Sequence, residues 1–184
     1  MDLSNIRIET ERLVLRPTAA GDFEAWAAFA ADPEVMRHLG GVLPRSTAWR
    51  GFIAMAGAWQ IQGFAMFSVI EKASGQWIGR VGPWMPEGWP GTEVGWALAR
   101  DAWGKGYGVE AAAATIDWSF AHLGWTEVIH TISPANDGSK ALARRLGSRQ
   151  LRMGRLPAPL ELDVEVWGQS REQWLARPAK GEQA

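Results

Sequence analysis

The chain has 184 residues, a formal net charge of −1 at pH 7, three histidines and no cysteine. This length is enough for one domain with a buried core, and 47% hydrophobic residues argue against disorder. A near-neutral charge gives no electrostatic reason to expect nucleic acid or a membrane as partner. The missing cysteines exclude a disulfide scaffold, a thiolate zinc site and a cysteine nucleophile, and three scattered histidines give little support to a metal site.

The start of the chain lacks the basic and apolar stretches of a signal peptide, and no apolar run reaches the length of a membrane span. We therefore expect a cytoplasmic protein. The sequence contains no internal repeat and no stretch with linker composition. We expect one domain over residues 1–177 and a frayed tail over residues 178–184.

The first half of the chain predicts a strand, three helices and a hairpin. The strand covers residues 6–15. Helical patterns then begin at Asp22, at Asp32 with Pro33 as first helical residue, and at Ser46 as N-cap. A turn ending in glycine joins two strands, which cover residues 65–71 and 76–84.

The second half alternates strands with helices. The predicted strands cover residues 92–98, 127–133, 149–153 and 163–167, and the helices cover 109–123 and 136–146, with a short helix after Ser170. Gly124 and Gly147 follow the two longer helices, where a C-terminal glycine is expected. The order predicts an α+β fold, a mixed and mostly antiparallel twisted sheet of about seven strands with helices on both faces.

The most informative segment is Trp103-Gly104-Lys105-Gly106-Tyr107-Gly108, at a junction between a strand and a helix. Glycine lets the backbone approach a ligand closely and permits positive φ. The free amides at the start of the helix then face the ligand, with the positive end of the helix dipole behind them. The segment therefore predicts a site for a phosphate group.

Two familiar phosphate motifs do not fit this segment. A P-loop requires Ser or Thr after Gly-Lys, whereas Gly106 follows Lys105 here. A dinucleotide fingerprint requires G-x-G-x-x-G, whereas the spacing here is G-x-G-x-G.

The segment resembles the coenzyme A pyrophosphate loop of the GNAT superfamily of N-acetyltransferases, Gln/Arg-x-x-Gly-x-Gly/Ala. Trp103 departs from the usual first residue. With Glu110-Ala111, however, the segment is similar to the branch of ribosomal-protein N-terminal acetyltransferases (RimJ/RimL). Residues 9–17, 93–96 and 134–139, with Leu146-Gly147, also resemble that branch in order, so the resemblance covers roughly residues 6 to 150.

The resemblance implies a sheet split between its fourth and fifth strands, with the pantetheine arm of acetyl-CoA lying in the split like an added strand. Lys105 either adds a charge or is a solvated loop lysine, Tyr107 is expected to have a structural role, and Ser139 either contacts the cofactor or caps a helix. The implied cofactor-binding residues are Trp96, Leu98, Trp103, Gly104, Lys105, Gly106, Tyr107, Gly108, Asn136 and Ser139.

The implied chemistry is direct attack of a primary amine on the thioester, which requires no cysteine. Glu93 is the candidate base, with a water-facing rim carboxylate as the alternative, and a backbone N–H between Trp96 and Leu98 is the candidate oxyanion donor. Many relatives place a tyrosine acid where this chain has Ala143, so Ser139 is the candidate proton donor to the thiolate.

Other polar and aromatic residues receive weaker assignments. Strand alternation places His130 on the apolar face as a packed residue, and it leaves Thr131 free to face the split. Ser148, where relatives usually carry an aromatic residue, is expected to affect packing only. Trp49 is expected in the core. The candidate acceptor-pocket residues are His38, Trp84 and Trp89.

Two other functions stay open. A non-catalytic acyl-CoA-binding module would explain the missing tyrosine, and a nucleotide-binding regulator could use the same loop. The acceptor can be a small-molecule amine or a peptide amine. A high tryptophan content also leaves a homodimer open.

Overall fold

The computed structural model describes residue 3 and residues 5–177. In this part of the chain, eight strands form one sheet in the order β1-β2-β3-β4-β5-β6-β8-β7. The β5–β6 pair is parallel and the other neighbouring strands are antiparallel. The strands are β1 (Ile8–Glu9), β2 (Leu13–Arg16), β3 (Phe67–Glu71), β4 (Trp77–Trp84), β5 (Glu93–Leu98), β6 (Glu127–Ile132), β7 (Arg149–Arg155) and β8 (Asp163–Ser170).

The predicted mixed, mostly antiparallel α+β architecture is confirmed, with eight strands where about seven were expected. The segment expected to be one strand over residues 6–15 forms two, β1 and β2, which pair with each other. Thr10 closes the turn between them, since its amide donates to Leu13 O (3.0 Å) and its Oγ1 accepts from Leu13 N (3.1 Å). The predicted tail over residues 178–184 lies outside the described residues.

The helices are α1 (Phe23–Ala31), α2 (Pro33–Met36), α3 (Arg45–Ile61), α4 (Tyr107–His122), α5 (Asp137–Arg145) and α6 (Arg171–Leu175), with 3₁₀ turns η1 (Ala20–Asp22) and η2 (Arg100–Ala102). The described residues include no helix that is both long and apolar enough to cross a bilayer.

Two expectations for the helices are confirmed and two are wrong. Asp32 caps α2 with Pro33 as its first residue, and Ser170 and Gln173 form a capping box on α6. Ser46, however, lies inside α3, because the amide of Thr47 already bonds to the carbonyl of Pro44 (2.9 Å). Trp49 is 47% exposed rather than in the core; the buried side of α3 carries Ala48, Phe52, Met55 and Trp59.

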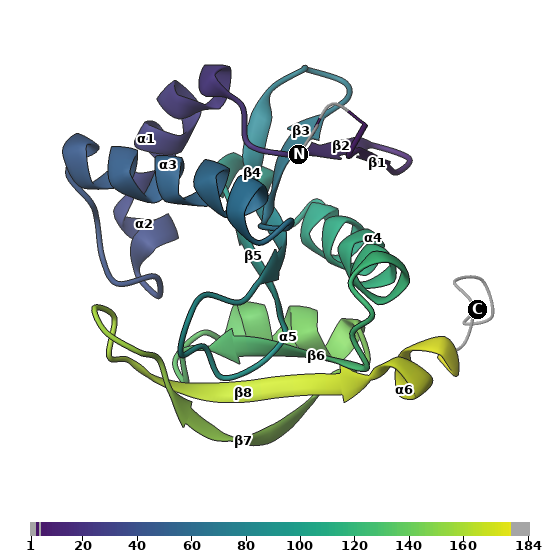
Figure 1. Cartoon of the computed structure of the whole chain (residues 1–184). Coiled ribbons are helices and arrows are strands. Elements are labelled where there is room, and N and C mark those ends of the chain that lie inside the picture. Colours follow the sequence, from purple (N-terminus) through teal and green to yellow (C-terminus); the bar gives the residue numbers. More distant parts are fainter. Residues whose placement is uncertain (1–2, 4, 178–184) are drawn as a thin grey trace.

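Helices cover both faces of the N-terminal part of the sheet. Arg80 of β4 packs against Trp26 of α1 on one face. Phe67 pairs with Val81, the next residue after Arg80, so it lies on the other face, where it contacts Trp118 of α4. Figure 1 shows α1, α2 and α3 gathered in the upper left, α4 on the right, and β6, β7 and β8 with α5 in the lower part of the molecule. The main core fills the upper part, and two smaller clusters pack around β6 and β8.

Candidate active site

The sheet splits between β5 and β6. These are the fourth and fifth strands of the expected sheet, because its first strand forms both β1 and β2, so the split lies where the resemblance implies. Strands β5 and β6 share a single register pair, Glu93 with Ile129, and beside it Ile129 N donates to Thr92 O (2.9 Å). A regular parallel ladder would next join Thr131 N to Val94 O.

Both of those atoms have side-chain partners instead. Thr131 N donates to Glu93 Oε1 (2.9 Å), and His130 Nδ1 donates to Val94 O (2.7 Å). We call Glu93 and His130 the wedge, because their side chains take the place of the next backbone bond between the two strands.

Glu93 is a buried carboxylate that connects three segments. It is 5% exposed, it accepts from Thr131 Oγ1 (3.0 Å) as well as Thr131 N, and it accepts from Trp89 Nε1 in the loop before β5. Burial raises the pKa of Glu93 to about 7, against the hydrogen bonds from Thr131 and Trp89, which lower it. The structure thus rules out the water-facing rim carboxylate and leaves a group that can exchange a proton near neutral pH.

His130 is packed, as expected, but it also carries polar contacts that sequence reasoning missed. It is 1% exposed, and its Nε2 lies 2.9 Å from Ser148 Oγ, which accepts from Gln169 Nε2 (2.9 Å). Because Nδ1 donates to a carbonyl, Nε2 of the neutral ring accepts from the serine. Burial lowers the pKa of His130 to about 4, so the ring is neutral. Ser148 therefore holds the wedge and is more than a packing residue.

Past the wedge, β5 has a free edge that faces the split. Backbone groups alternate in direction along a strand, so Trp96 and Leu98 face the same side as Val94. Leu98 O accepts from Trp103 Nε1 (2.8 Å). The amide and carbonyl of Trp96 and the amide of Leu98 therefore point into the split, where β6 is no longer paired with β5.

The glycine corner, residues 103–108, follows β5 and begins α4. Gly104 and Gly106 have φ of +73° and +81°, which side chains rarely adopt. A Cβ on Gly104 would meet nothing within 4 Å, so the corner is open. The first helical bond runs from Glu110 N to Gly106 O (3.2 Å), and the amides before it have no acceptor in the helix. Gly108 differs, because a Cβ there would lie 2.7 Å from Leu142 of α5.

Arg12 in the β1–β2 turn holds the glycine corner in place. Arg12 donates through Nε to Glu110 Oε2 (2.7 Å) and through Nη1 to Lys105 O (2.9 Å), and its guanidinium lies over the Tyr107 ring. Tyr107 OH donates to Glu71, which fits the structural role expected for it. The side chain of Lys105 is exposed. The corner is therefore held by its surroundings, while its outer side stays open.

A family model described as an acetyltransferase (GNAT) domain matches residues 12–149. The chain belongs to this family. The uncharacterized N-acetyltransferase p20 of Bacillus licheniformis is 32% identical over 141 residues, which cover 74% of this chain and 79% of that protein.

An acetyltransferase of Agrobacterium tumefaciens of known structure has a TM-score of 0.78 and 31% identity, over 93% of this chain and 98% of that one. A ribosomal-protein-S5-alanine acetyltransferase of Vibrio fischeri shares the fold, with a TM-score of 0.69 and 19% identity over 95% of this chain and 100% of that one.

In this GNAT acetyltransferase, Asn136 and Ser139 lie at the start of α5. Asn136 Oδ1 accepts from Ser139 N (3.0 Å), so Asn136 is the helix cap and Ser139 is not. Ser139 Oγ accepts from Trp96 Nε1 (3.2 Å) and keeps its own proton to donate. Ala143, which stands where relatives carry a tyrosine, is fully buried.

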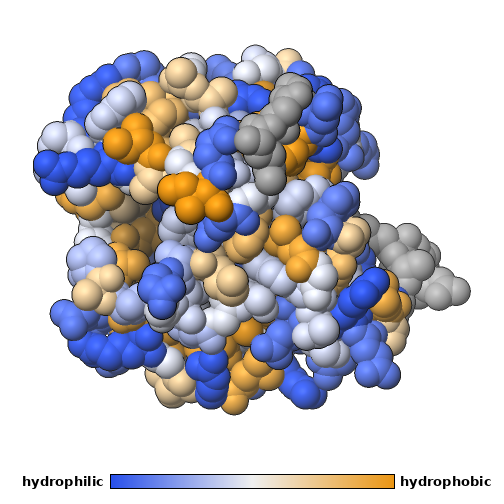
Figure 2. Space-filling view, viewed as in Figure 1, coloured by the Kyte–Doolittle hydropathy of each residue, from blue (hydrophilic) through white to orange (hydrophobic). Residues whose placement is uncertain are grey.

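Two of the acceptor-pocket candidates meet at Glu93. Trp84 pairs with Glu93 across β4 and β5, and Trp89 donates to the same glutamate. His38 lies close enough to Asp137 of α5 to contribute, after Lys140 and Arg144, to the lowered pKa of that carboxyl. Figure 2 shows a hollow on the left side of the acetyltransferase, between its upper and lower parts.

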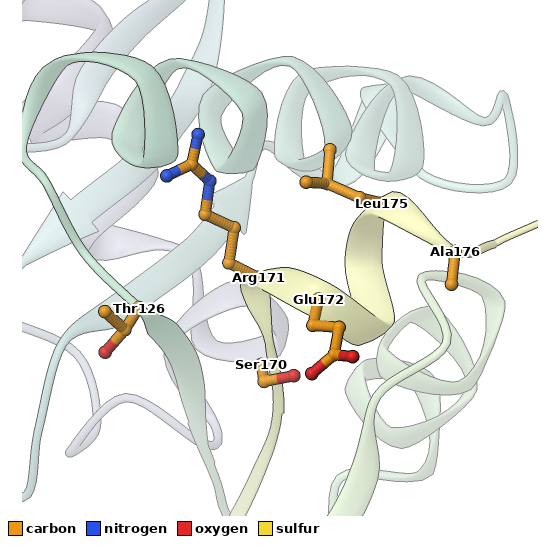
Figure 3. A pocket seen from close by; sticks show the side chains of 6 residues that line it. All are labelled: Thr126, Ser170, Arg171, Glu172, Leu175 and Ala176. Atoms are coloured by element: carbon orange, nitrogen blue, oxygen red, sulfur yellow. The ribbon is translucent and has the colours of Figure 1, made fainter.

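Two other depressions of the acetyltransferase contain none of the expected site residues. An open one of about 700 Å³ lies between the start of β6 and α6 (Figure 3), and one of about 390 Å³ lies beside α1. In Figure 3, Arg171 and Leu175 point to one side of α6 and Glu172 to the other. Neither depression adjoins the wedge or the glycine corner, so we place the candidate site at the split.

Proposed function

We propose that this GNAT acetyltransferase moves an acetyl group from acetyl-CoA to a primary amine. The observation that carries the proposal is the free edge of β5, which lies between an open glycine corner and a buried carboxylate with a pKa of about 7. Family membership supports acetyl transfer in general. The arrangement supports the finer assignment of cofactor, acceptor and roles.

The residues at the split fit coenzyme A. The unpaired amides of the glycine corner suit a pyrophosphate, and the space beside Gly104 is open to receive it. The free backbone groups of Trp96 and Leu98 suit an extended pantetheine arm, with Asn136 and Ser139 on the opposite side of the split. When bound, acetyl-CoA supplies an activated acyl group as a thioester.

The side chains of the site would then accept and donate the protons of the reaction. Glu93 takes a proton from the acceptor ammonium, because its raised pKa leaves it partly ionised at neutral pH. A C–N bond to the amine forms while the C–S bond breaks. The attacking nitrogen also loses its second proton, and Ser139 Oγ–H, or water, relays a proton from the nitrogen to the sulfur. The acceptor is a small-molecule or peptide amine that approaches Glu93 past Trp84 and Trp89.

Release of free thiol from acetyl-CoA, measured with a broad panel of amines, tests the proposal. We expect amine-dependent release above the hydrolysis background. Stabilisation by coenzyme A without any amine-dependent release would favour a non-catalytic acyl-CoA-binding module, for which the buried Ala143 in place of a tyrosine is the supporting observation. Thermal stabilisation by ATP and not by coenzyme A would contradict the choice of cofactor and favour a nucleotide-binding regulator.

A further inference from the structure

Arg80, in the middle of β4, has a buried guanidinium nitrogen, Nε. Among the described residues, this Nε is the buried side-chain nitrogen or oxygen that lacks a hydrogen-bonding partner. The guanidinium lies 4.8 Å from the ring centroid of Trp26, which contributes a cation–π contact but accepts no directed hydrogen bond from the fork. Buried polar groups in proteins are nearly always hydrogen-bonded, so this one requires a physical explanation.

Three of the other arginines that stack on aromatic rings also pair with a carboxylate. Arg12 pairs with Glu110, Arg45 with Glu24, and Arg177 lies 3.8 Å from Asp117. Arg144, which stacks on Trp167, has no such ion pair among the described residues, but it is exposed to water. Arg80 combines the missing ion pair with a buried Nε.

Asp22, which reaches this face of the sheet through Ser68, already has other partners. Ser68 pairs with Arg80 across β3 and β4, and its hydroxyl donates to Asp22 (2.7 Å). Asp22 also accepts from both terminal nitrogens of Arg16 (2.8 and 2.6 Å) and from Ala19 N (3.0 Å). Asp22 is therefore the partner of Arg16 and not of Arg80.

Arg80 and Glu93 lie on the same face of the sheet. The register pairs Arg80 with Ala97, Gly82 with Gly95, and Trp84 with Glu93, so alternation places all six positions on one face. A Cβ on Gly95 would lie 3.4 Å from Glu93 Oε1, which puts the carboxylate over that glycine on the same face. Burial lowers the pKa of Arg80 to about 10, and the charge of Glu93 acts against this, although the two residues make no direct ion pair in the described part of the chain.

The face that carries Arg80 is covered by α1 at Trp26, but not by the helix that begins at the glycine corner. The glycine corner begins α4, which covers the other face, through contacts such as Trp118 with Phe67. An amine that reaches Glu93 must therefore come from the side that carries Arg80. Building on the proposed function, we infer that Arg80 binds a carboxylate carried by the acceptor amine. The acceptor class is then amino-carboxylates, such as amino acids or acidic peptides, and excludes polyamines and aminoglycosides.

The chemistry of the guanidinium suits this role. Its planar fork binds a carboxylate through two parallel hydrogen bonds, and the low polarity beside Trp26 strengthens them. The charges of the bound acceptor also match the site, because the amine of the acceptor faces Glu93 and its carboxylate faces Arg80. A purely structural Arg80 would instead serve to hold Trp26 and α1 in place.

Matched amine pairs test the inference: glycine with glycinamide, β-alanine with β-alaninamide, and 4-aminobutyrate with its amide. For each pair, kcat/KM is measured for the wild type, Arg80→Met, Arg80→Lys and Arg177→Gln. The last variant removes a cation from a tryptophan face at α6 as the control. Comparing the ratio within each pair cancels the different basicities of the two amines. Unfolding midpoints are measured in parallel.

We expect the wild type to prefer at least one carboxylate over its amide and Arg80→Met to reduce that preference roughly 10- to 100-fold, the usual effect of losing a charged hydrogen bond. Arg80→Lys should restore part of it, and Arg177→Gln should leave it unchanged. Arg80→Met should melt no lower than the wild type, because an unpaired buried cation stabilises little.

An unchanged preference in Arg80→Met, a wild-type preference for the amides, or a large loss of stability with no change in preference would overturn the inference while leaving acetyl transfer intact. No thiol release from any amine would count against the proposed function itself. The two failures are therefore distinguishable.

Discussion

The glycine corner and the wedge lie at opposite ends of the same free strand edge, and they are built in different ways. The corner is a continuous six-residue segment whose backbone is open to solvent at Gly104. The wedge is a set of buried side chains joined by contacts across 36 and 38 residues of sequence, from His130 to Val94 and from Thr131 to Glu93.

Because of this difference, the corner suits cofactor binding and the wedge suits proton transfer. The corner offers fixed backbone amides that do not titrate, which suits holding a phosphate at any pH. The wedge offers two groups whose pKa values burial has moved in opposite directions, which suits proton transfer and makes the split sensitive to pH. Substitutions in the two regions should therefore affect different kinetic constants.

Glu93→Gln should have the largest effect. It keeps the shape of the side chain but removes the proposed base, so kcat should fall by roughly 10²- to 10⁴-fold while the affinity for coenzyme A changes little. In the wild type, kcat/KM should rise with pH and level off above about 7, as Glu93 ionises, and the variant should lose that limb. A pH–rate profile of both proteins checks this; a variant with unchanged kcat would remove Glu93 from the chemistry.

His130→Leu should have the next largest effect, on stability. It leaves Val94 O without a donor and Ser148 Oγ without its acceptor, at a cost of about 2–4 kcal/mol in the free energy of unfolding. Urea unfolding measures this loss. Ser148→Ala, which keeps the bond to Val94, is the matched control and should lose less.

The pH dependence of stability sharpens the same comparison. The folded pKa of Glu93 lies above 4.5, so its contribution is fully present below pH 4.5 and is lost as the pH rises toward 7. The folded pKa of His130 lies below 6.5, so its contribution is lost as the pH falls from 6.5 toward 4. Each amounts to about 3 kcal/mol and the two oppose each other.

The wild type should therefore show little net slope from this pair between pH 4 and 7. Relative to the wild type, Glu93→Gln should gain stability with rising pH, and His130→Leu should lose it. Unfolding free energies measured at several pH values in this window decide the matter. Parallel curves for all three proteins would show that the two groups do not titrate as their burial implies.

Gly106→Ala should act on binding rather than on chemistry. The residue has φ of +81°, where a side chain costs about 1–2 kcal/mol. The corner relaxes to relieve this strain and must return to the bound conformation, so the Kd for coenzyme A should rise about tenfold and kcat at saturation should stay the same. Titration calorimetry measures the affinity. Gly57→Ala in α3, where a Cβ meets nothing within 4 Å, is the control. Equal affinities in the variant and the wild type would show that the corner does not hold the cofactor.

Ser139→Ala should have the smallest effect. A thiol is acidic enough to leave with help from water, so kcat should fall no more than about tenfold. The indole of Trp96 also loses its acceptor, and the affinity for coenzyme A is measured to separate that loss from a loss of proton donation. A fall in kcat much greater than this would make Ser139 the principal acid.

Local features of the site were predictable from sequence because their cause is local. The glycine corner, the Asp32-Pro33 start of α2 and the Ser170 cap each depend on residues a few positions apart. The strand order around the split came from a family resemblance and agrees with the parallel β5–β6 pair. Strand alternation also identified Thr131 as a residue facing the split, where it contacts Glu93.

What sequence reasoning missed depends on contacts between distant segments. The chain from Gln169 through Ser148 to His130 joins β8, the end of α5 and β6, and no spacing predicts it. Trp49 was misplaced because its apolar neighbours Phe52 and Ile53 fit a helical face, whereas the buried face carries Ala48 and Phe52, and Phe52 packs on Trp26 of α1. The sequence did contain a signal that could have identified Arg80, because a charged residue stands there between apolar positions of a strand that are buried in the structure.

The free backbone of β5 also bears on how the protein avoids aggregation. Open strand edges attract the edges of other chains, and natural sheets protect them by shortness or by charge. At the outer borders of this sheet, β1 is two residues long and β7 carries Arg149, Arg152 and Arg155. The open edge of β5 has neither protection, but it lies between the two parts of the sheet, where another folded chain has no access and a slender molecule can enter.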